Sequence, residues 1–217
     1  MLLKKLIPLF TLFLLNTSYL QAGSFLNGAD LHSEEIVIQY SGEKGYLHIV
    51  EYNIRSLKKS KADIEAQAAE MIQEAKKKQF CKKRFKLEDF TSLEETFQVK
   101  DRKLDAEYHL MTHNDNVYDL LKSIMSEILG EEVTVEVTPK LTVLQYNSEA
   151  YKAATGSNAI GPVEKDGHYN LFWRPGTQNF QMIFNTKRKG KPIRKYFPEK
   201  VGSRKLSKEE IESWRDQ

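Results

Sequence analysis

The stretch EYHLMTHND, residues 107–115, gathers two histidines and two carboxylates. Alternate side chains of an extended strand point to one face, which predicts that Glu107 and His109 lie together. His113 continues that face if the strand extends, and Asp115 follows directly. Imidazole and carboxylate groups together suit zinc, copper or nickel. The HExxH motif is absent, and alternating polar residues are also typical of a solvent-facing strand. One hypothesis is therefore a metal-binding protein or hydrolase centred on these four residues.

The only cysteine of the chain, Cys81, stands among seven basic side chains in KKKQFCKKRFK, residues 76–86. Neighbouring cations stabilise a thiolate, which is the setting of a reactive cysteine. The same stretch follows a predicted helix, however, and the negative end of a helix dipole disfavours a thiolate. Phe80 and Phe85 also bracket the thiol with apolar bulk. We expect a structural or exposed free thiol rather than a catalytic one, and a single cysteine cannot form an internal disulfide.

The strongest functional signal is a concentration of charge, because residues 187–205 hold nine Lys or Arg and one acid. Such a local field attracts anionic lipid headgroups, lipopolysaccharide, acidic wall polymers, nucleic acid or an acidic protein. The alternative is a solvated surface extension without a partner. The candidate binding residues are Lys187, Arg188, Lys189, Lys191, Arg194, Lys195, Tyr196, Arg204 and Lys205, together with Trp173 of the preceding aromatic stretch.

Other catalytic motifs are absent from the sequence. Residues 156–163, GSNAIGPV, lack the Lys and Ser/Thr of a phosphate-binding loop, and no GxSxG nucleophile motif occurs. The paired carboxylates are adjacent in sequence and so face opposite sides of a strand, which does not indicate a glycosidase. These absences favour a non-enzymatic protein, and we expect no cofactor.

Hairpins are the main elements expected to position these residues. EEIVIQY (34–40) and GYLHIVEYNI (45–54) read as two strands joined by a short turn. Residues 133–137 and 141–146 predict a second hairpin, and strand-like stretches also occupy residues 85–112. A third hairpin is expected from two aromatic stretches around PGTQ, HYNLFWR (168–174) and FQMIFN (180–185). Its face bearing Tyr169, Leu171 and Trp173 predicts either core or a partner-binding surface.

Two amphipathic helices accompany the strands. Ser60 caps the first, with Asp63 in the capping-box position, and we expect that helix to end near Phe80. The second has an apolar stripe over residues 117–129 and stops at Gly130. Shorter helices are predicted over residues 148–155 and after Ser207. The order favours an α+β fold, a largely antiparallel β-sheet built from hairpins with two main amphipathic helices packed on one face and a short C-terminal helix.

The first 22 residues read as a secretory signal peptide, because Lys4 and Lys5 precede an apolar run over residues 6–15. That run is too short to span a bilayer, which needs about 20 residues. The chain holds 33 Lys+Arg and 30 Asp+Glu. Cleavage would leave it nearly neutral, so any attraction to polyanions must come from charge segregated within the chain.

The sequence therefore predicts a signal peptide (1–22), a single α+β domain (23–186) and a basic C-terminal segment (187–217) that ends in a short helix. We expect a periplasmic or secreted, non-enzymatic binding or adaptor protein without a transmembrane anchor. Its basic C-terminal region would engage an anionic envelope component or a protein partner. Contact with a membrane surface fits this composition, whereas nucleic acid is disfavoured.

Overall fold

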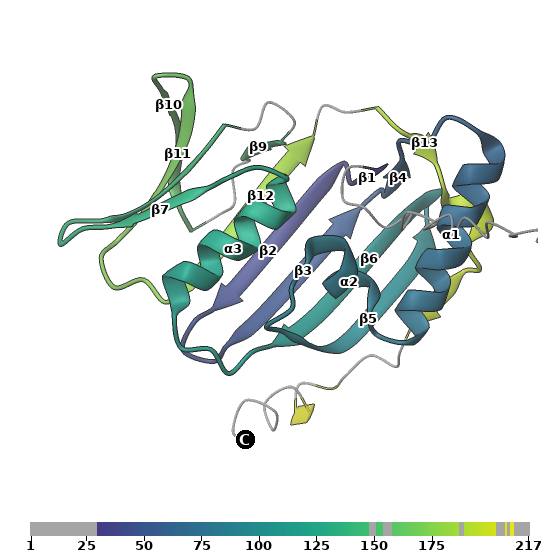
Figure 1. Cartoon of the computed structure of the whole chain (residues 1–217), viewed down its shortest axis with the longest axis horizontal. Helices are drawn as coiled ribbons and strands as arrows, with labels where there is room; N and C mark the ends of the chain where they lie inside the picture. Colours follow the sequence, from purple (N-terminus) through teal and green to yellow (C-terminus); the bar gives the residue numbers. More distant parts are fainter. Residues whose placement is uncertain are drawn as a thin grey trace, which may run out of the picture.

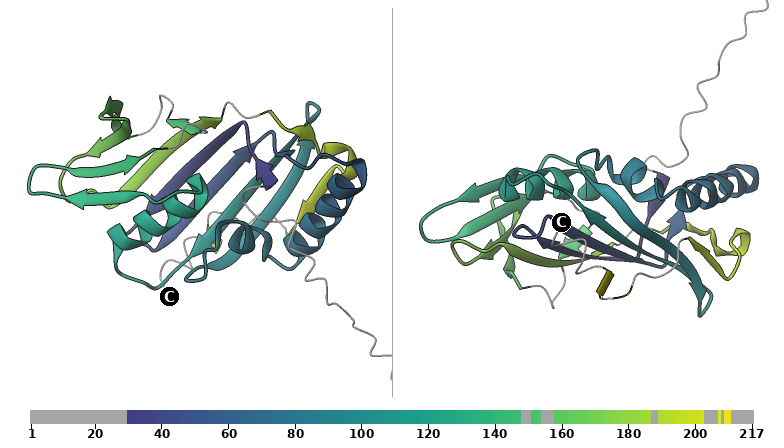
Figure 2. Two further views of the ribbon diagram at one scale, coloured as in Figure 1. Left: turned by 45° about the horizontal axis from the view of Figure 1, so that its top comes forward. Right: turned by 90° about the horizontal axis from the view of Figure 1, so that it is seen from below.

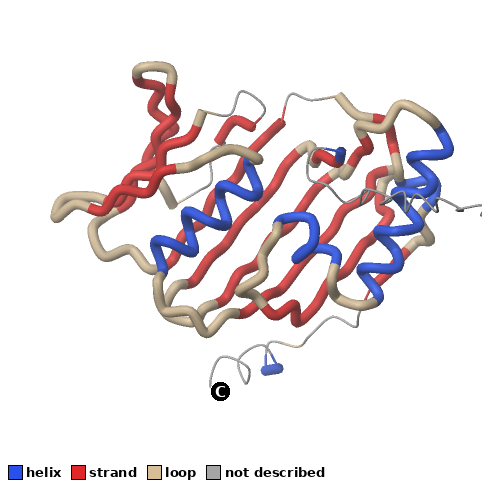
Figure 3. Tube along the Cα trace, viewed as in Figure 1, coloured by secondary structure: helices blue, strands red, loops and turns tan. Residues whose placement is uncertain are grey.

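The computed structural model describes residues 30–147, 151–153, 158–186, 189–202, 207 and 209–210, with the backbone alone for 151–153. The predicted signal peptide lies outside these residues. Figures 1 and 3 show long strands that run side by side across the molecule, with helices laid against them. Helices and strands are thus combined in one α+β arrangement.

The main sheet has seven strands in the order β14-β5-β6-β3-β2-β12-β9, and every neighbouring pair is antiparallel. The predicted largely antiparallel sheet is therefore confirmed. In chain order the strands are β2 (Glu35–Ser41), β3 (Tyr46–Tyr52), β5 (Thr91–Lys100), β6 (Lys103–Met111), β9 (Tyr151–Ala153), β12 (Asn179–Thr186) and β14 (Lys200–Gly202).

Two smaller antiparallel sheets complete the described strands. One has the order β10-β11-β8-β7 and lies at the end of the molecule away from α1 (Figure 1). Its strands are β7 (Thr134–Val137), β8 (Thr142–Tyr146), β10 (Ile160–Lys165) and β11 (His168–Trp173). The other joins three two-residue strands, β1 (Leu31–His32), β4 (Arg55–Ser56) and β13 (Lys191–Pro192), and a 3-10 turn, η2 (Arg194–Tyr196), follows the last.

The helices that the structure describes from end to end are α1 (Lys61–Lys76), α2 (Phe80–Phe85) and α3 (Val117–Leu129), and Figure 2 shows them along one side of the main sheet. The Ser60 hydroxyl caps α1 by accepting a hydrogen bond from the Asp63 N–H at 3.0 Å, as the sequence predicts. Asn116 caps α3 in the same way, and Gly130 ends that helix with a φ of 71°.

The chain between α1 and β5 differs from the prediction. The first helix ends at Lys76 rather than near Phe80, because Lys78 takes a φ of 55° that breaks the helix. A second short helix, α2, then follows, and it ends at Phe85, where a strand was expected to begin. It starts there because the buried Glu95 carboxylate accepts hydrogen bonds from the N–H groups of Phe80 and Cys81, at 2.9 and 3.3 Å.

The two aromatic stretches around PGTQ do not form the predicted hairpin. β11 pairs with β8 and β10, whereas β12 pairs with β2 and β9, so the turn carries the chain from one sheet to another. Trp173 and Phe180 still meet edge-on, with ring centroids 5.2 Å apart, because both rings enter the core between the sheets. Residues 151–153 form strand β9 rather than helix; the rest of that predicted helix lies outside the described residues.

An ion pair is buried between α2 and the main sheet. The Glu51 carboxylate accepts hydrogen bonds from Ser33 at 2.6 Å, from Tyr108 at 2.8 Å and from the Arg84 guanidinium at 2.8 Å. The side chains of Arg84 and Glu51 are 2% and 0% exposed, so each charge depends on the other for compensation. The pair ties α2 to β3 and β6.

Arg84→Met is expected to lower the free energy of unfolding by about 3–5 kcal/mol, because it leaves the Glu51 charge buried without its partner. Adding Glu51→Gln to that variant removes the orphaned charge and should restore part of the loss. Urea denaturation of the three proteins measures both effects. A loss below about 1 kcal/mol for Arg84→Met would contradict a closed ion pair at this position.

Cys81 is fully buried in the first turn of α2 rather than at the end of a helix. Burial raises its thiol pKa well above the ordinary value, and the nearby Glu95 and Glu51 carboxylates add to that effect. The lysines that surround Cys81 in sequence therefore do not make it a thiolate. Of the two predicted alternatives, the structure shows the buried core thiol.

Burial also raises the pKa of Glu95 to about 7, although hydrogen bonds to its carboxylate act in the opposite direction. The folded protein then holds this proton more tightly than the unfolded chain, whose glutamates titrate near 4.5. Stability should fall as the pH rises from about 4.5 to about 7 and level off above that. The difference in pKa corresponds to about 3 kcal/mol.

Glu95→Gln cannot ionise and should lack this decline, which urea denaturation at a series of pH values can measure. The comparison is the free energy of unfolding of the wild type minus that of the variant. A difference that stays constant from pH 4 to 8 would show that Glu95 titrates normally.

Candidate metal centre on the open face of the main sheet

Five polar side chains form a row across five neighbouring strands of the main sheet. Residues that are direct partners in an antiparallel pair point to the same face. Each strand contributes one side chain, and each of these residues is the direct partner of the next one across the sheet. In that order they are Gln181 (β12), Gln39 (β2), His48 (β3), His109 (β6) and Glu94 (β5). The residues that alternate with them, such as Ile49 and Tyr108, are buried on the face that packs against the helices. The row therefore lies on the face of the main sheet away from α1, α2 and α3, which we call the open face.

Glu107 brings the two histidines of this row to a single point. Its Oε1 atom lies 3.1 Å from His48 Nε2 and 3.2 Å from His109 Nε2. The two imidazole rings stack with centroids 4.4 Å apart and planes 7° from parallel. One ligand atom from each residue lies within 4.8 Å of the others. We call these three residues, His48, Glu107 and His109, the histidine–carboxylate centre.

The second nitrogen of each ring is also hydrogen-bonded. Gln39 Oε1 lies 3.2 Å from His48 Nδ1, and the Tyr46 hydroxyl bonds His109 Nδ1. Because a carbonyl oxygen only accepts, the Gln39 side chain accepts a hydrogen bond from His48 Nδ1, and the Nε2 side of that ring faces Glu107. Partners of this kind fix the tautomer and orientation of metal-ligating histidines.

The Glu107 carboxylate is held in its charged form. Hydrogen bonds from His109 and His48 keep its pKa well below the usual range, and these outweigh the opposing effect of burial. The centre thus sets one anionic oxygen against two imidazole nitrogens.

A β-bulge adds a second carboxylate. The register of β5 against β6 shifts between Ser92 and Glu94, so that Glu94 rather than Leu93 stands opposite His109. The Glu94 side chain is 3% exposed, and its Oε2 lies 4.0 Å from His109 Nε2. Thr96 donates a hydrogen bond to the other oxygen at 3.1 Å. The bulge therefore places Glu94 within a small movement of the centre.

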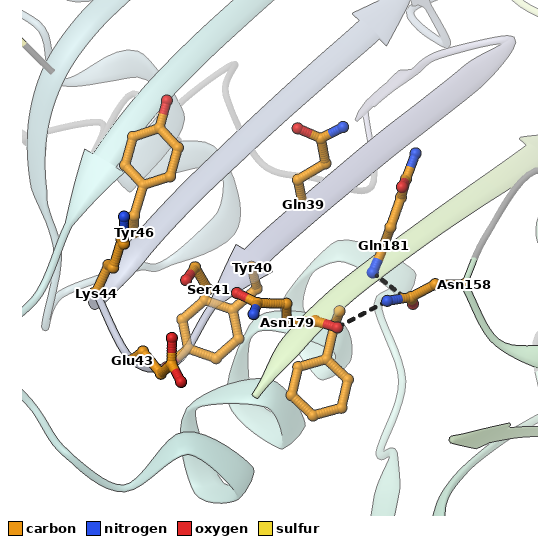
Figure 4. A pocket seen from close by; sticks show the side chains of 10 residues that line it. Gln39, Tyr40, Ser41, Glu43, Lys44, Tyr46, Asn158, Asn179 and Gln181 are labelled. Atoms are coloured by element: carbon orange, nitrogen blue, oxygen red, sulfur yellow. Dashed lines mark hydrogen bonds between the residues drawn. The ribbon is translucent and has the colours of Figure 1, made fainter. Parts of the chain in front are cut away.

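A depression of about 520 Å³ adjoins the centre (Figure 4). Gln39 and Tyr46 line it and also hold the two histidines, and Gln181 stands opposite. Asn158 fixes the far wall: its amide donates to the Asn179 carbonyl at 2.8 Å and accepts from Trp173 Nε1 at 2.8 Å. Four of the ten lining residues carry amide side chains, which both donate and accept hydrogen bonds.

Of the four predicted metal-binding residues, the structure brings two together. Glu107 and His109 meet in the centre, whereas His113 and Asp115 lie exposed in the segment between β6 and α3 and are not part of the convergent group. The third member of the centre is His48. The sequence predicts that His48 lies on a strand, but local patterns do not reveal that Glu107, 59 residues later, lies beside it.

The predicted binding residues of the C-terminal segment have several environments. Lys189, Lys191 and Lys195 are exposed, and Arg194 and Tyr196 are partly buried. Trp173 is 3% exposed and packs in the core, so it offers no ring to a partner. The others, Lys187, Arg188, Arg204 and Lys205, lie outside the described residues, as does most of the predicted C-terminal helix; Ser207 and Glu210 do make both hydrogen bonds of its capping box.

Comparisons of the chain with protein-family models, with curated proteins and with solved structures find no match. Within the described part of the chain, no helix combines the length and the apolar character needed to cross a membrane. Any function must therefore be argued from the side chains themselves.

Proposed function

We propose that the protein binds a divalent transition metal through His48 Nε2, His109 Nε2 and Glu107 Oε1. The observation that carries this proposal is the meeting of two imidazole nitrogens at one carboxylate oxygen, at 3.1 and 3.2 Å. Zinc lies about 2.0–2.1 Å from such ligands, which sets neighbouring ligand atoms of a tetrahedral site about 3.3 Å apart. Small side-chain adjustments would admit the ion.

The ligand types favour particular metals. Two imidazoles with one carboxylate suit zinc, copper or nickel, whereas calcium and magnesium prefer oxygen ligands alone. His48 and His109 are each oriented by a hydrogen bond at Nδ1, which leaves Nε2 for the metal. The chemistry of the centre thus supports a transition metal over an alkaline-earth ion.

We further propose a binding protein rather than a hydrolase. Catalytic zinc sites keep one coordination position for water, whereas four protein ligands close a site. Glu94 is the fourth ligand in this proposal, because the bulge in β5 directs its buried carboxylate toward His109. The N-terminal sequence pattern supports a periplasmic or secreted location.

Isothermal titration of the wild type with Zn²⁺, Cu²⁺ and Ni²⁺ should reveal one site per chain for at least one of the three metals. His48→Ala and His109→Ala are each expected to weaken that binding by on the order of 100-fold or more, because each removes a ligand. His113→Ala is the matched control, a histidine of the same region outside the centre, and should bind as the wild type does. Equal losses in His48→Ala and His113→Ala, or no binding by the wild type, would refute the centre.

Glu94→Gln tests the closure of the site. If Glu94 is the fourth ligand, the variant should bind metal roughly 10-fold or more weakly. Its Co²⁺ complex should also lose the intense visible absorption of a tetrahedral site with four protein ligands. Unchanged affinity and an unchanged spectrum would leave the fourth position to water and would favour the hydrolase alternative.

A further inference from the structure

We propose that a second surface of the protein binds anionic phospholipid headgroups. This basic surface consists of cations from β4, the start of α1 and the β13–η2 segment: Arg55, Lys59, Lys189, Lys191 and Lys195. It is independent of the metal centre, since it shares no residue with it.

Strand pairing brings these cations together. β13 runs antiparallel to β4, with Lys191 opposite Ser56. The Lys191 ammonium donates to the carbonyl of Lys59, and Arg55 donates to the carbonyl of Gly190 at 3.4 Å. Gly190 permits the close approach, because a Cβ at this position would lie 2.8 Å from the Ser56 carbonyl oxygen. Carbonyl groups carry no net charge, so these contacts orient the cations without neutralising them.

Internal ion pairs distinguish this surface from the other basic cluster of the chain, around Cys81. There, Lys77 and Lys83 both bind Glu74, at 3.3 and 2.6 Å, and Lys86 binds Glu127 at 3.3 Å. Among the described residues, no carboxylate forms an ion pair with any of the five cations of the basic surface. Arg55 does act on the nearby Glu34 carboxylate, whose pKa it helps to lower, so the four lysines carry the charge that remains available to an external anion.

The basic surface belongs to the folded structure. Ile193 is 0% exposed and Val201 is 6% exposed, which anchors the segment in the core on both sides of Lys195. β14 also pairs with β5 at the edge of the main sheet. The backbone that carries the cations is therefore already ordered in the folded protein. Binding does not incur the entropy cost of ordering it. Removing everything after Thr186 would delete core residues, so substitutions are the sound test.

A lipid surface suits these cations better than nucleic acid does. Binding to single-stranded nucleic acid relies on exposed aromatic rings for base stacking. Here Phe197 is 9% exposed, and the Lys195 ammonium covers the Tyr196 ring at 4.8 Å from its centroid. Anionic headgroups need only clustered cations, each worth roughly a fivefold gain in affinity near the membrane surface. The predicted export of the chain would also place it beside the envelope lipids.

The test uses residues 23–217, which contain every described residue, in cosedimentation with vesicles. Vesicles of phosphatidylcholine and phosphatidylglycerol are compared with phosphatidylcholine alone. The variant Lys189→Gln/Lys191→Gln/Lys195→Gln should bind the anionic vesicles on the order of 100-fold more weakly than the wild type. Wild-type binding should also fall as salt shortens the screening length from roughly 10 Å at 0.1 M to 3 Å at 1 M.

The matched control is Lys122→Gln/Lys140→Gln/Lys165→Gln, three exposed lysines elsewhere that give the same net charge. It should bind vesicles as the wild type does. Equal loss in both triple variants would show that net charge alone drives adsorption and would overturn the proposal. So would equal binding to neutral vesicles, no binding to either kind, or retention by polyphosphate or single-stranded DNA in place of vesicles. Urea denaturation confirms that both variants remain folded.

Discussion

The register of β3 against β6 is the constraint on which the rest of the molecule depends. On the helix-facing side, these strands contribute Glu51 and Tyr108, which share a hydrogen bond and hold the buried Arg84. On the open side, the same strands contribute His48 and His109, which are direct partners. A slip of one residue would turn every side chain to the opposite face and bury the histidines while exposing the ion pair. The polar core contact therefore also fixes the geometry of the candidate centre.

The bulge in β5 lets two neighbouring carboxylates serve opposite faces of the sheet. Leu93 and Glu94 together oppose one position of β6, and this sets Glu94 beside His109. Glu95 then points into the core, where it holds the N–H groups at the start of α2. A regular strand would also direct Glu94 and Glu95 to opposite faces of the sheet. Without the bulge, however, Leu93 rather than Glu94 would lie opposite His109. The extra residue thus sets a carboxylate, rather than an apolar side chain, opposite His109.

Local patterns were enough to predict the elements whose signals lie within a few residues. The caps of α1 and α3, the apolar stripe of α3 and the β2–β3 hairpin are of this kind, as is the placement of Glu107 beside His109 on one strand. The remaining features depend on partners distant in sequence. His48 joins the centre through a strand pairing that links it to Glu107, 59 residues away. The start of α2 depends on a carboxylate in β5, and the PGTQ turn resembles a hairpin turn although its flanking strands enter different sheets.

The distribution of charge on the folded protein likewise cannot be predicted from neighbouring residues in the sequence. The stretch around Cys81 is the densest basic run in the sequence, yet carboxylates from α1, α3 and β3 neutralise much of it in the folded chain. The segment that contains β13 and η2 makes no such ion pairs within the described residues, although Lys58 nearby binds Asp30 at 2.6 Å. Because screening in water weakens distant charges, the field outside a nearly neutral protein follows the cations that lack a close partner. Residual charge after internal pairing, rather than the local count of lysines, therefore decides which surface attracts an anion.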